Sequence, residues 1–403
     1  MPAIYGVPLE FFIFGVTLLG VAVLHRHALP IAVCGLLTTI VYKLAYTGFD
    51  TGDGLSGLAQ HFAHEWVTLS NLLFLLLGFS LIARHFEDSR VPAILPHFLP
   101  DGWTGGLALL VIVFVLSSFL DNIAGALIGG AMAHALFRGR VHIGFLAAIV
   151  AASNAGGAGS VIGDTTTTMM WIEGVAPSEV FHAYVAAIVA LLVFGIPAAR
   201  QQHRWSPMIK DAPPSVRVDW ARIVVVGVVL GSAVAINVVV NTRFPELADR
   251  FPFIGAAVAV TMLATLPVRR PDWTVIPAAF KGAVFLLSLV ASASLMPVEA
   301  LPVPTWQSTF GLGIVSAVFD NIPVTALALK QGGYDWGVLA YAVGFGGSMI
   351  WFGSSAGVAL ASLFPEARST GRWLLDGWHV ALGYVLGFFA LLLTLGWQPH
   401  APG

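Results

Sequence analysis

The chain has 403 residues, of which 57% are hydrophobic and only 10% are charged, and its mean hydropathy is +0.85. Soluble globular domains carry about 25% charged residues, so this composition excludes an ordinary soluble protein. Unbroken apolar segments recur along the chain, whereas a membrane β-barrel would show short alternating strands. The formal net charge of −2 gives no indication of nucleic-acid binding. The sequence therefore predicts an all-α polytopic membrane protein without a separate soluble domain.

Two features near the start of the chain support this class. Residues 1–10 contain no Lys or Arg, so the first apolar run is interpreted as a retained span and not as a cleavable signal. The single cysteine, Cys34, lies inside an apolar segment and cannot form an intrachain disulfide. We expect it to be a small core residue.

A helix needs about 20 apolar residues to cross a bilayer, and about 10–12 membrane segments are expected in all. Residues 55–66 are expected to form an amphipathic helix at the membrane interface, separate from the span that follows. The expected apolar runs are 5–24, 29–46, 67–85, 103–120, 123–137, 141–152, 181–199, 222–240, 253–266, 276–295, 310–319, 336–352 and 373–397.

Two of these runs stop at an acid followed by an amide, Asp121-Asn122 and Asp320-Asn321. A carboxylate at membrane depth is costly and by default marks an ion or substrate path. Residues 154–168 and 346–355 are rich in glycine and polar side chains, and irregular backbone is tolerated in a membrane only inside protein or beside a water-filled cavity. These segments predict broken helices or re-entrant hairpins.

The breaks occur in the same order in both halves of the chain. The pair Gly156-Gly157 is followed by Gly163, and Gly346-Gly347 is followed at the same spacing by Gly353. We therefore expect a first transmembrane repeat over residues 1–200, a cytoplasmic linker over 201–221 and a second repeat over 222–403.

Charge predicts the orientation of the repeats. The connection around residues 200–222 is the most basic in the chain, which places it in the cytoplasm by the positive-inside rule. Arg84, Arg90 and Arg269-Arg270 then also fall inside, so corresponding spans run in opposite directions. Such inverted repeats underlie many alternating-access carriers, and both termini would face outside.

The Asp-Asn pairs have an evident chemistry. A broken helix frees backbone carbonyls, and a nearby carboxylate and amide oxygen can then coordinate Na⁺ or Li⁺. A buried carboxylate can also carry a proton, so proton and cation would compete for the same oxygens of Asp121 and Asp320. The alternative is that each Asp lies at a membrane surface and only caps a helix.

The segment after Asn154 allows two interpretations. The oxygens of Asn154, Asp164, Thr166 and Thr167 suit a cation, with a Na⁺ site expected at Asp121, Asn122 and Asp164. The helix N-terminus that follows Gly163 would instead attract an anion. Capping and interhelix hydrogen bonding are the structural alternative.

The matching segment of the second half offers the hydroxyls of Ser348, Ser354 and Ser355. Ser354 occupies the position of Asp164, so we expect more negative charge in the first half. Lys281 interrupts an apolar span, and it either snorkels to the interface or pairs with a buried Asp.

Two histidines lie close together near the start of the third span. His61 and His64 are followed by Glu65, which suggests a metal site or a pH-responsive surface. No nucleotide-binding glycine motif, zinc spacing or nucleophile elbow is present, so an enzyme is not expected and neither is a cofactor.

These motifs together resemble the ion transporter superfamily, which groups NhaD-type sodium/proton antiporters with arsenite and citrate carriers; the NhaD type is the nearest. The resemblance extends from about Leu72 to the end of the chain. It rests on Leu120-Asp121-Asn122, Asn154-Ala155-Gly156-Gly157, Gly163-Asp164-Thr165-Thr166-Thr167 with Met169 and Trp171, and Ser316 with Asp320-Asn321.

The resemblance implies an inverted-repeat bundle, often dimeric, in a lipid bilayer, with the bacterial inner membrane as the expected location. It gives the role of polar ion-path residues to Asp121, Asn122, Asn154, Asp164, Thr166, Thr167, Ser316 and Asn321. The chain departs from the family in being short and in its segment Ala158-Gly159-Ser160-Val161.

The leading hypothesis is a secondary transporter that exchanges Na⁺ or Li⁺ for H⁺. A carboxylate carrier of the citrate type, or an oxyanion carrier, is the second, although Lys281 is the only intramembrane cation suggested by the sequence to neutralise such a substrate. A membrane scaffold protein that does not transport is the third.

Overall fold

A computed structural model describes residues 3–4, 6–24, 27–210, 216–248 and 250–400. Part of the expected linker therefore lies outside the described residues. The helices are α1 (Leu9–Val23), α2 (Ala28–Tyr42), α3 (Gly54–Asp88), α4 (Val91–Ile94), α5 (Trp103–Ser117), α6 (Asn122–Leu136), α7 (Ile143–Ala158), α8 (Thr165–Ile172), α9 (Pro177–Phe181), α10 (Ala183–Trp205), α11 (Trp220–Arg243), α12 (Pro245–Ala248), α13 (Phe253–Ala264), α14 (Ile276–Ser294), α15 (Trp306–Ser316), α16 (Asn321–Gln331), α17 (Trp336–Gly346), α18 (Ser355–Leu363), α19 (Thr370–Asp376) and α20 (Trp378–Leu395).

A π-helix, η2 (Lys43–Thr47), continues α2. Strands β1 (Ala3–Ile4) and β2 (Val7–Pro8) form one short antiparallel pairing ahead of α1.

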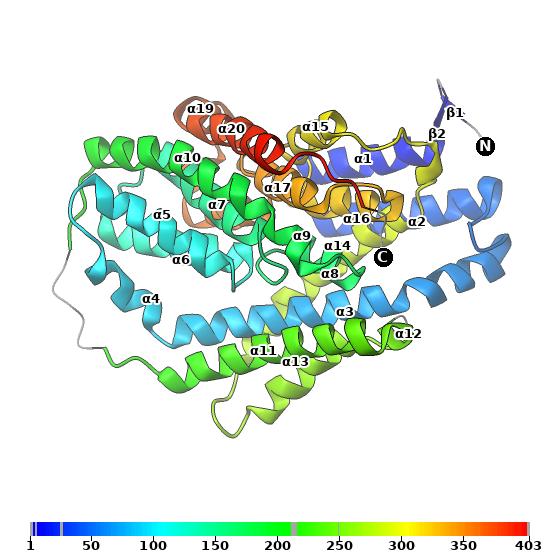
Figure 1. The fold of residues 1–403 in the computed structure, drawn as a ribbon, viewed down its shortest axis with the longest axis horizontal. Helices are drawn as coiled ribbons and strands as arrows, with labels where there is room; N and C mark the ends of the chain where they lie inside the picture. The colour runs from blue at the N-terminus through cyan, green and yellow to red at the C-terminus, as the bar shows by residue number, and fades with distance from the viewer. Residues whose placement is uncertain (1–2, 5, 25–26, 211–215, 249, 401–403) are drawn as a thin grey trace.

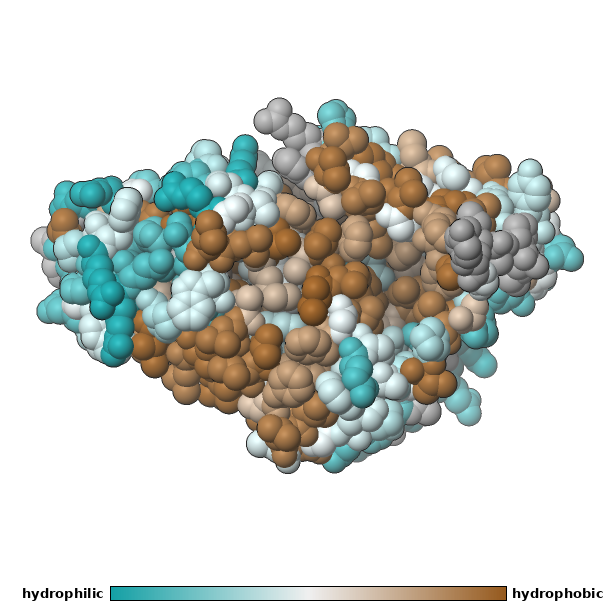
Figure 2. Space-filling view, turned by 90° about the horizontal axis from the view of Figure 1, so that it is seen from above, coloured by the Kyte–Doolittle hydropathy of each residue, from teal (hydrophilic) through white to brown (hydrophobic). Residues whose placement is uncertain are grey.

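The molecule is an all-α, multi-pass integral membrane protein. Within the described residues, 6 helices are long and apolar enough to cross a membrane, and shorter apolar helices accompany them. Hydrophobic side chains gather over the middle of the face shown in Figure 2, while hydrophilic ones gather toward its ends. An apolar middle between polar ends is what a bilayer requires.

Helix α3 corrects one expectation from the sequence. The expected interface helix at 55–66 and the span after it form a single helix of 35 residues, about 52 Å long at 1.5 Å per residue. Residues 58–77 contain neither glycine nor proline, so nothing interrupts the backbone hydrogen bonding between the two parts.

Helices from the two halves pack against one another. In Figure 1, α11 and α13 lie below α3, while α10 and α20 lie together on the opposite side of the molecule. Helix α6 packs on α18, and α8 packs on α16, so the segments that follow the four breaks cross between the halves. The breaks are thereby brought into the middle of the bundle.

The glycines of the two halves make matching close approaches. A Cβ at Gly156 would overlap the carbonyl oxygen of Phe114, and one at Gly346 would overlap that of Gly313. These contacts hold α5 against α7 and α15 against α17. The two halves share this packing feature; the two repeats and their inverted orientation stay predictions.

One end of the bundle carries a network of ion pairs. Arg84 contacts Glu87 (3.1 Å), Asp88 (3.4 Å) and Asp272 (3.2 Å), and Asp219 contacts Arg269 (2.7 Å). The C-terminal end of α3 therefore lies beside the segments that precede α11 and α14. This end is called the Arg84 end below.

Cys34 is exposed, contrary to the expectation of a core position. It lies on α2, whose outward-facing side chains are apolar, as suits a helix in contact with lipid. The thiol is therefore not enclosed by the described residues.

Candidate functional site

The four breaks position several of the expected polar residues in one cluster. The chain leaves α5 at Ser117 and re-enters a helix at Asn122, and it leaves α7 at Ala158 and re-enters at Thr165. Asn122 Nδ2 donates to Asp164 Oδ2 (2.9 Å) and to Asn154 Oδ1 (3.1 Å). All three side chains are buried. The two breaks of the first half thus meet through an Asn-Asp contact.

The second half contributes to the same cluster. Asn321 Nδ2 donates to Asp164 Oδ2 (3.4 Å). Asn154 Nδ2 donates to Ser348 Oγ (3.0 Å) and to Ser354 Oγ (3.1 Å). The carboxylate of Asp164 and the amide of Asn154 therefore both join the two halves of the chain.

Asp164 is held by several donors. Besides the two amide groups, the backbone N–H of Thr166 donates to Asp164 Oδ1 (3.0 Å), which makes Asp164 the N-cap of α8. Three N–H donors stabilise the charged carboxylate in a buried place. Asp164 thus caps α8, as the structural alternative held, and it also contacts the second half of the chain.

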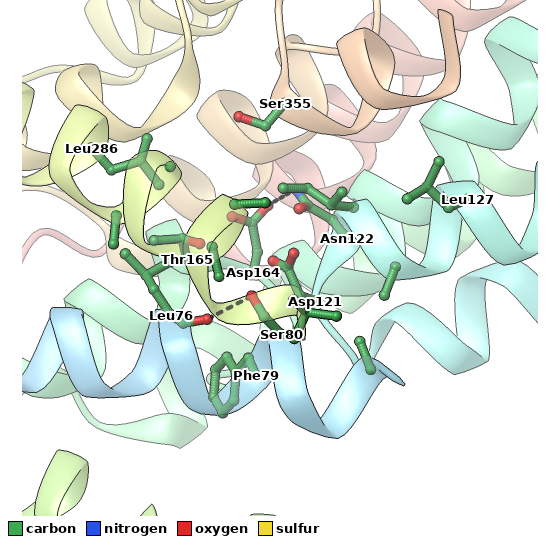
Figure 3. A pocket seen from close by; sticks show the side chains of 18 of the residues that line it. Leu76, Phe79, Ser80, Asp121, Asn122, Leu127, Asp164, Thr165, Leu286 and Ser355 are labelled. Atoms are coloured by element: carbon green, nitrogen blue, oxygen red, sulfur yellow. Dashed lines mark hydrogen bonds between the residues drawn. The ribbon is translucent and has the colours of Figure 1, made fainter. Parts of the chain in front are cut away.

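Asp121 and Asp320 differ in their surroundings. Asp320 accepts hydrogen bonds from Ser355 Oγ (2.9 Å) and from the backbone N–H of Ile322 (3.1 Å). The side chain of Asp121 makes no capping hydrogen bond to α6. Figure 3 shows the carboxylates of Asp121 and Asp164 beside the same space, and the two are close enough to repel each other.

A cavity of about 380 Å³ leads from this cluster to the Arg84 end. Its floor includes Asp121, Asn122, Asp164 and Asn321, and its walls come from α3 and α14. At its far end lie Arg84, Glu87 and Val275. Figure 3 shows side chains that line this cavity, with those of Asp121, Asn122 and Asp164 near the middle of the view.

Three expected site residues are buried away from the lining of the cavity. Ser316 is fully buried and donates to the carbonyl of Val343 (2.8 Å), which ties α15 to α17. The hydroxyl of Thr167 donates to the carbonyl of Ser160 (2.6 Å). Thr166 is fully buried, and its hydroxyl makes no hydrogen bond to a described residue. None of the three lines the cavity.

The structure corrects two further expectations. Lys281 is exposed on α14, which speaks against pairing with a buried Asp, while snorkelling to the interface stays a prediction. His61 is buried and bonds Ser294 Oγ (3.0 Å), whereas His64 is exposed. In the described ranges no group of three possible metal ligands exists, so His61, His64 and Glu65 do not form one.

Sequence reasoning missed two kinds of residue. Ser80 lines the cavity, but a lone hydroxyl within an apolar helix has no distinctive pattern. Thr165 belongs to the motif after Gly163 and also lines the cavity, although it was not among the expected site residues. Lys43 and Lys330 were passed over because each stands at the end of an apolar run, where a lysine is normally interfacial. Both in fact bind backbone carbonyls at the end of α14.

Comparison with known proteins supports the motif resemblance. No family model matches the chain. Sodium/proton antiporters 1 and 2 of Arabidopsis thaliana are 26% and 27% identical over 352 and 354 residues, each covering 74% of this chain. The Na(+)/H(+) antiporter NhaD of Vibrio parahaemolyticus is 26% identical over 391 residues, or 83% of this chain.

The chain covers different shares of these relatives. It spans 58% of the first plant protein, 80% of the second and 92% of the Vibrio protein. The aligned regions include most of this chain. The resemblance to NhaD-type sodium/proton antiporters, first indicated by the motifs, is therefore confirmed over most of the chain.

Proposed function

We propose that the protein is a secondary transporter that exchanges Na⁺ or Li⁺ for protons across the membrane. The ion site is formed by Asp121, Asn122, Asp164 and Asn321 at the inner end of the cavity. The observation that carries this proposal is that the carboxylates of Asp121 and Asp164 line the same cavity while the two amide groups of the cluster donate to Asp164 alone.

The site is suited to a small cation by its charge. Two carboxylates face the same space, and Arg84, the one basic residue among those lining the cavity, lies at the other end in contact with three acids. The amide nitrogens of Asn122 and Asn321 are directed to Asp164, which leaves their Oδ1 atoms for a cation. Oxygen ligands of this kind coordinate Na⁺ in broken-helix transporters.

Asp121 is the group at which proton and cation compete. The amides of Asn122 and Asn321 donate to Asp164, whereas the carboxylate of Asp121 faces the backbone N–H groups of Asn122 and Ile123, so a proton or a cation displaces no side-chain donor of the cluster. Protonation and cation binding each remove the repulsion from Asp164, and both cannot occupy the same oxygens. Exchange follows if the site is accessible from one side of the membrane at a time.

The arrangement of charges argues against the carboxylate-carrier alternative. A polyvalent anion would meet two carboxylates at the site, while Lys281 is exposed on α14. Bringing an anion next to these acids without a basic partner is unfavourable. The cation exchange reaction is therefore the function we propose.

Purified protein in proteoliposomes containing a pH-sensitive dye tests the proposal. Addition of Na⁺ or Li⁺ to vesicles with a preset pH gradient is expected to move protons, and K⁺ or choline is not. Loss of the response in Asp121→Asn, with an unchanged amount of folded protein in the vesicles, supports the assignment of the site. Absence of exchange in the parent protein would favour a scaffold role, and citrate-driven movement would favour the anion carrier.

A further inference from the structure

The end of the molecule opposite the Arg84 end is closed by two lysines and an aspartate. Lys330 Nζ donates to the carbonyls of Ser294 and Met296, each at 2.7 Å, and contacts Asp50 Oδ2 at 2.9 Å. Lys43 Nζ donates to the carbonyl of Leu295 at 3.0 Å. Three consecutive carbonyls at the end of α14 are therefore bound by two ammonium groups. This set is called the lysine cluster below.

Segments distant in the chain meet at the lysine cluster. Lys43 comes from η2, Asp50 from the loop before α3, and Lys330 from the last turn of α16. His61, on α3, bonds Ser294 Oγ. The last carbonyls of a helix lack partners within the helix, and positive charge is favourable there. A single lysine would satisfy that need, whereas here four segments are tied to one helix end.

Helix α16 connects this cluster to the ion site. It begins at Asn321, which donates to Asp164, and it ends one residue after Lys330. The 11 residues of α16 span about 16 Å at 1.5 Å per residue, so a rigid helix links the two places. A displacement of Lys330 relative to α14 therefore moves Asn321 against Asp164.

The space between the site and the lysine cluster is filled by apolar side chains. Ile322 and Ala326 of α16 pack in one buried cluster with Leu286, Leu289 and Ala293 of α14. The cavity, in contrast, extends from the site toward the Arg84 end. The site is thus open toward one end of the molecule and sealed toward the other.

We propose that Lys330, with Asp50 and Lys43, is a positioning group for ion exchange that keeps the lysine-cluster end of the molecule closed. Release of Lys330 from Asp50 and from the end of α14 lets α16 separate from α14 and opens a second route to the site. The transport consequence rests on the proposed function, but the opening itself does not.

Labelling of introduced cysteines measures the opening directly. The exposed Cys34 is first replaced by serine. Ser292→Cys then places a thiol on the buried part of α14 near the lysine cluster, where the native hydroxyl bonds only within its own helix to Ser288. Ala279→Cys places one on the wall of the cavity. A membrane-impermeant maleimide is applied to vesicles of each orientation.

Lys330→Met is expected to raise the rate of Ser292→Cys labelling about tenfold from the lysine-cluster side, because the rate follows the population of the open form. Asp50→Asn removes the same ion pair from the other partner and should act in the same direction. Lys330→Arg, which keeps a charged donor, should restore slow labelling. Lys281→Met removes an exposed lysine of α14 and should change nothing.

Equal labelling rates in Lys330→Met, Asp50→Asn and the parent would overturn the proposal, as would an equal rise in Lys281→Met. Exchange rates are measured in the same preparations. A labelling change in a protein without exchange leaves the closing role standing and removes the proposed function. Exchange with unchanged labelling removes the closing role and leaves the proposed function standing.

Discussion

The amide nitrogen of Asn321 donates to the carboxylate of Asp164, and this contact joins the two halves of the chain across 157 positions of sequence. The same carboxylate accepts from Asn122 and from the backbone N–H of Thr166. In the other half, the position of Asp164 is held by Ser354, which accepts from Asn154. The two halves therefore meet through an acid on one side and a hydroxyl on the other.

Asp164→Asn is expected to destabilise the protein as well as to impair exchange. The substitution replaces one carboxylate oxygen by an NH₂ group, which cannot accept a hydrogen bond. In either orientation of the amide, at least one of the three donors therefore loses its acceptor. A lost hydrogen bond to a charged group costs about 2 kcal/mol. Thermal unfolding in detergent should show a lower Tm than that of the parent. Asp164→Ser introduces the residue that occupies this position in the other half. Its hydroxyl can still accept a hydrogen bond, so this variant tests whether the length of the side chain also affects the Tm. An unchanged Tm in Asp164→Asn would show that these contacts do not hold the halves together.

Asp121→Asn and Asp320→Asn are expected to separate the two acids by function. Asp320 accepts a hydrogen bond from the hydroxyl of Ser355, whereas Asp121 lines the cavity and faces only backbone N–H groups of its own helix start. Loss of a direct contact to the cation should lower the exchange rate at least about tenfold in Asp121→Asn, since 1.4 kcal/mol corresponds to a factor of ten. Asp320→Asn should lose much less in the same dye assay. An equal loss in both would mean that they act as equivalent ligands.

The sequence predicted the breaks and the clustering better than the individual contacts. An Asp-Asn pair at the end of an apolar run has few structural explanations in a membrane, so its burial near the centre could be expected. Which donor meets which acceptor could not, because Asn321 and Asp164 are brought together only by the packing of α8 on α16. The hydrogen bond from Ser316 to α17 depends on the same kind of packing, and that from Thr167 to the loop residue Ser160 depends on how the chain turns between α7 and α8.

Lys330 shows another limit of the sequence. Its place at the end of an apolar segment is typical of an interfacial lysine, and only the fold reveals that the end of α14 lies beside it. In α3, by contrast, the sequence pattern predicted a feature that the fold does not contain. The polar residues of 55–66 suggested an interface helix, but continuous hydrogen bonding over a stretch without helix breakers outweighed that pattern.

Gly156→Ala and Gly346→Ala test the matched close approaches of the two halves. Each added methyl group would meet a backbone carbonyl of the neighbouring helix, that of Phe114 or of Gly313. Overpacking of this kind typically costs about 1–3 kcal/mol, so both variants should unfold at lower temperature. Gly231→Ala is the control, since its Cβ would meet nothing and alanine favours a helix by up to about 1 kcal/mol. A lower unfolding temperature in only one of these two variants would contradict the matched packing.

Asp219→Asn tests the ion pairs at the Arg84 end. The hydrogen bond from Arg269 lowers the pKa of the Asp219 carboxyl below its ordinary value of 3.8. A lowered pKa in the folded protein favours the folded state when the carboxyl is ionised. The stabilisation is therefore present above pH 3.8 and disappears as the pH falls through the lower folded value.

The Tm of Asp219→Asn in detergent should accordingly lie below that of the parent at pH 7, and the difference should shrink as the pH falls below 4. Because Arg269 and Asp219 are both partly exposed, the effect should be small and sensitive to salt. At about 1 M choline chloride, where the Debye length is about 3 Å, most of the difference should vanish without adding a transported cation. A Tm difference that stays constant from pH 7 to pH 3 would mean that Asp219 acts through packing and not through its charge.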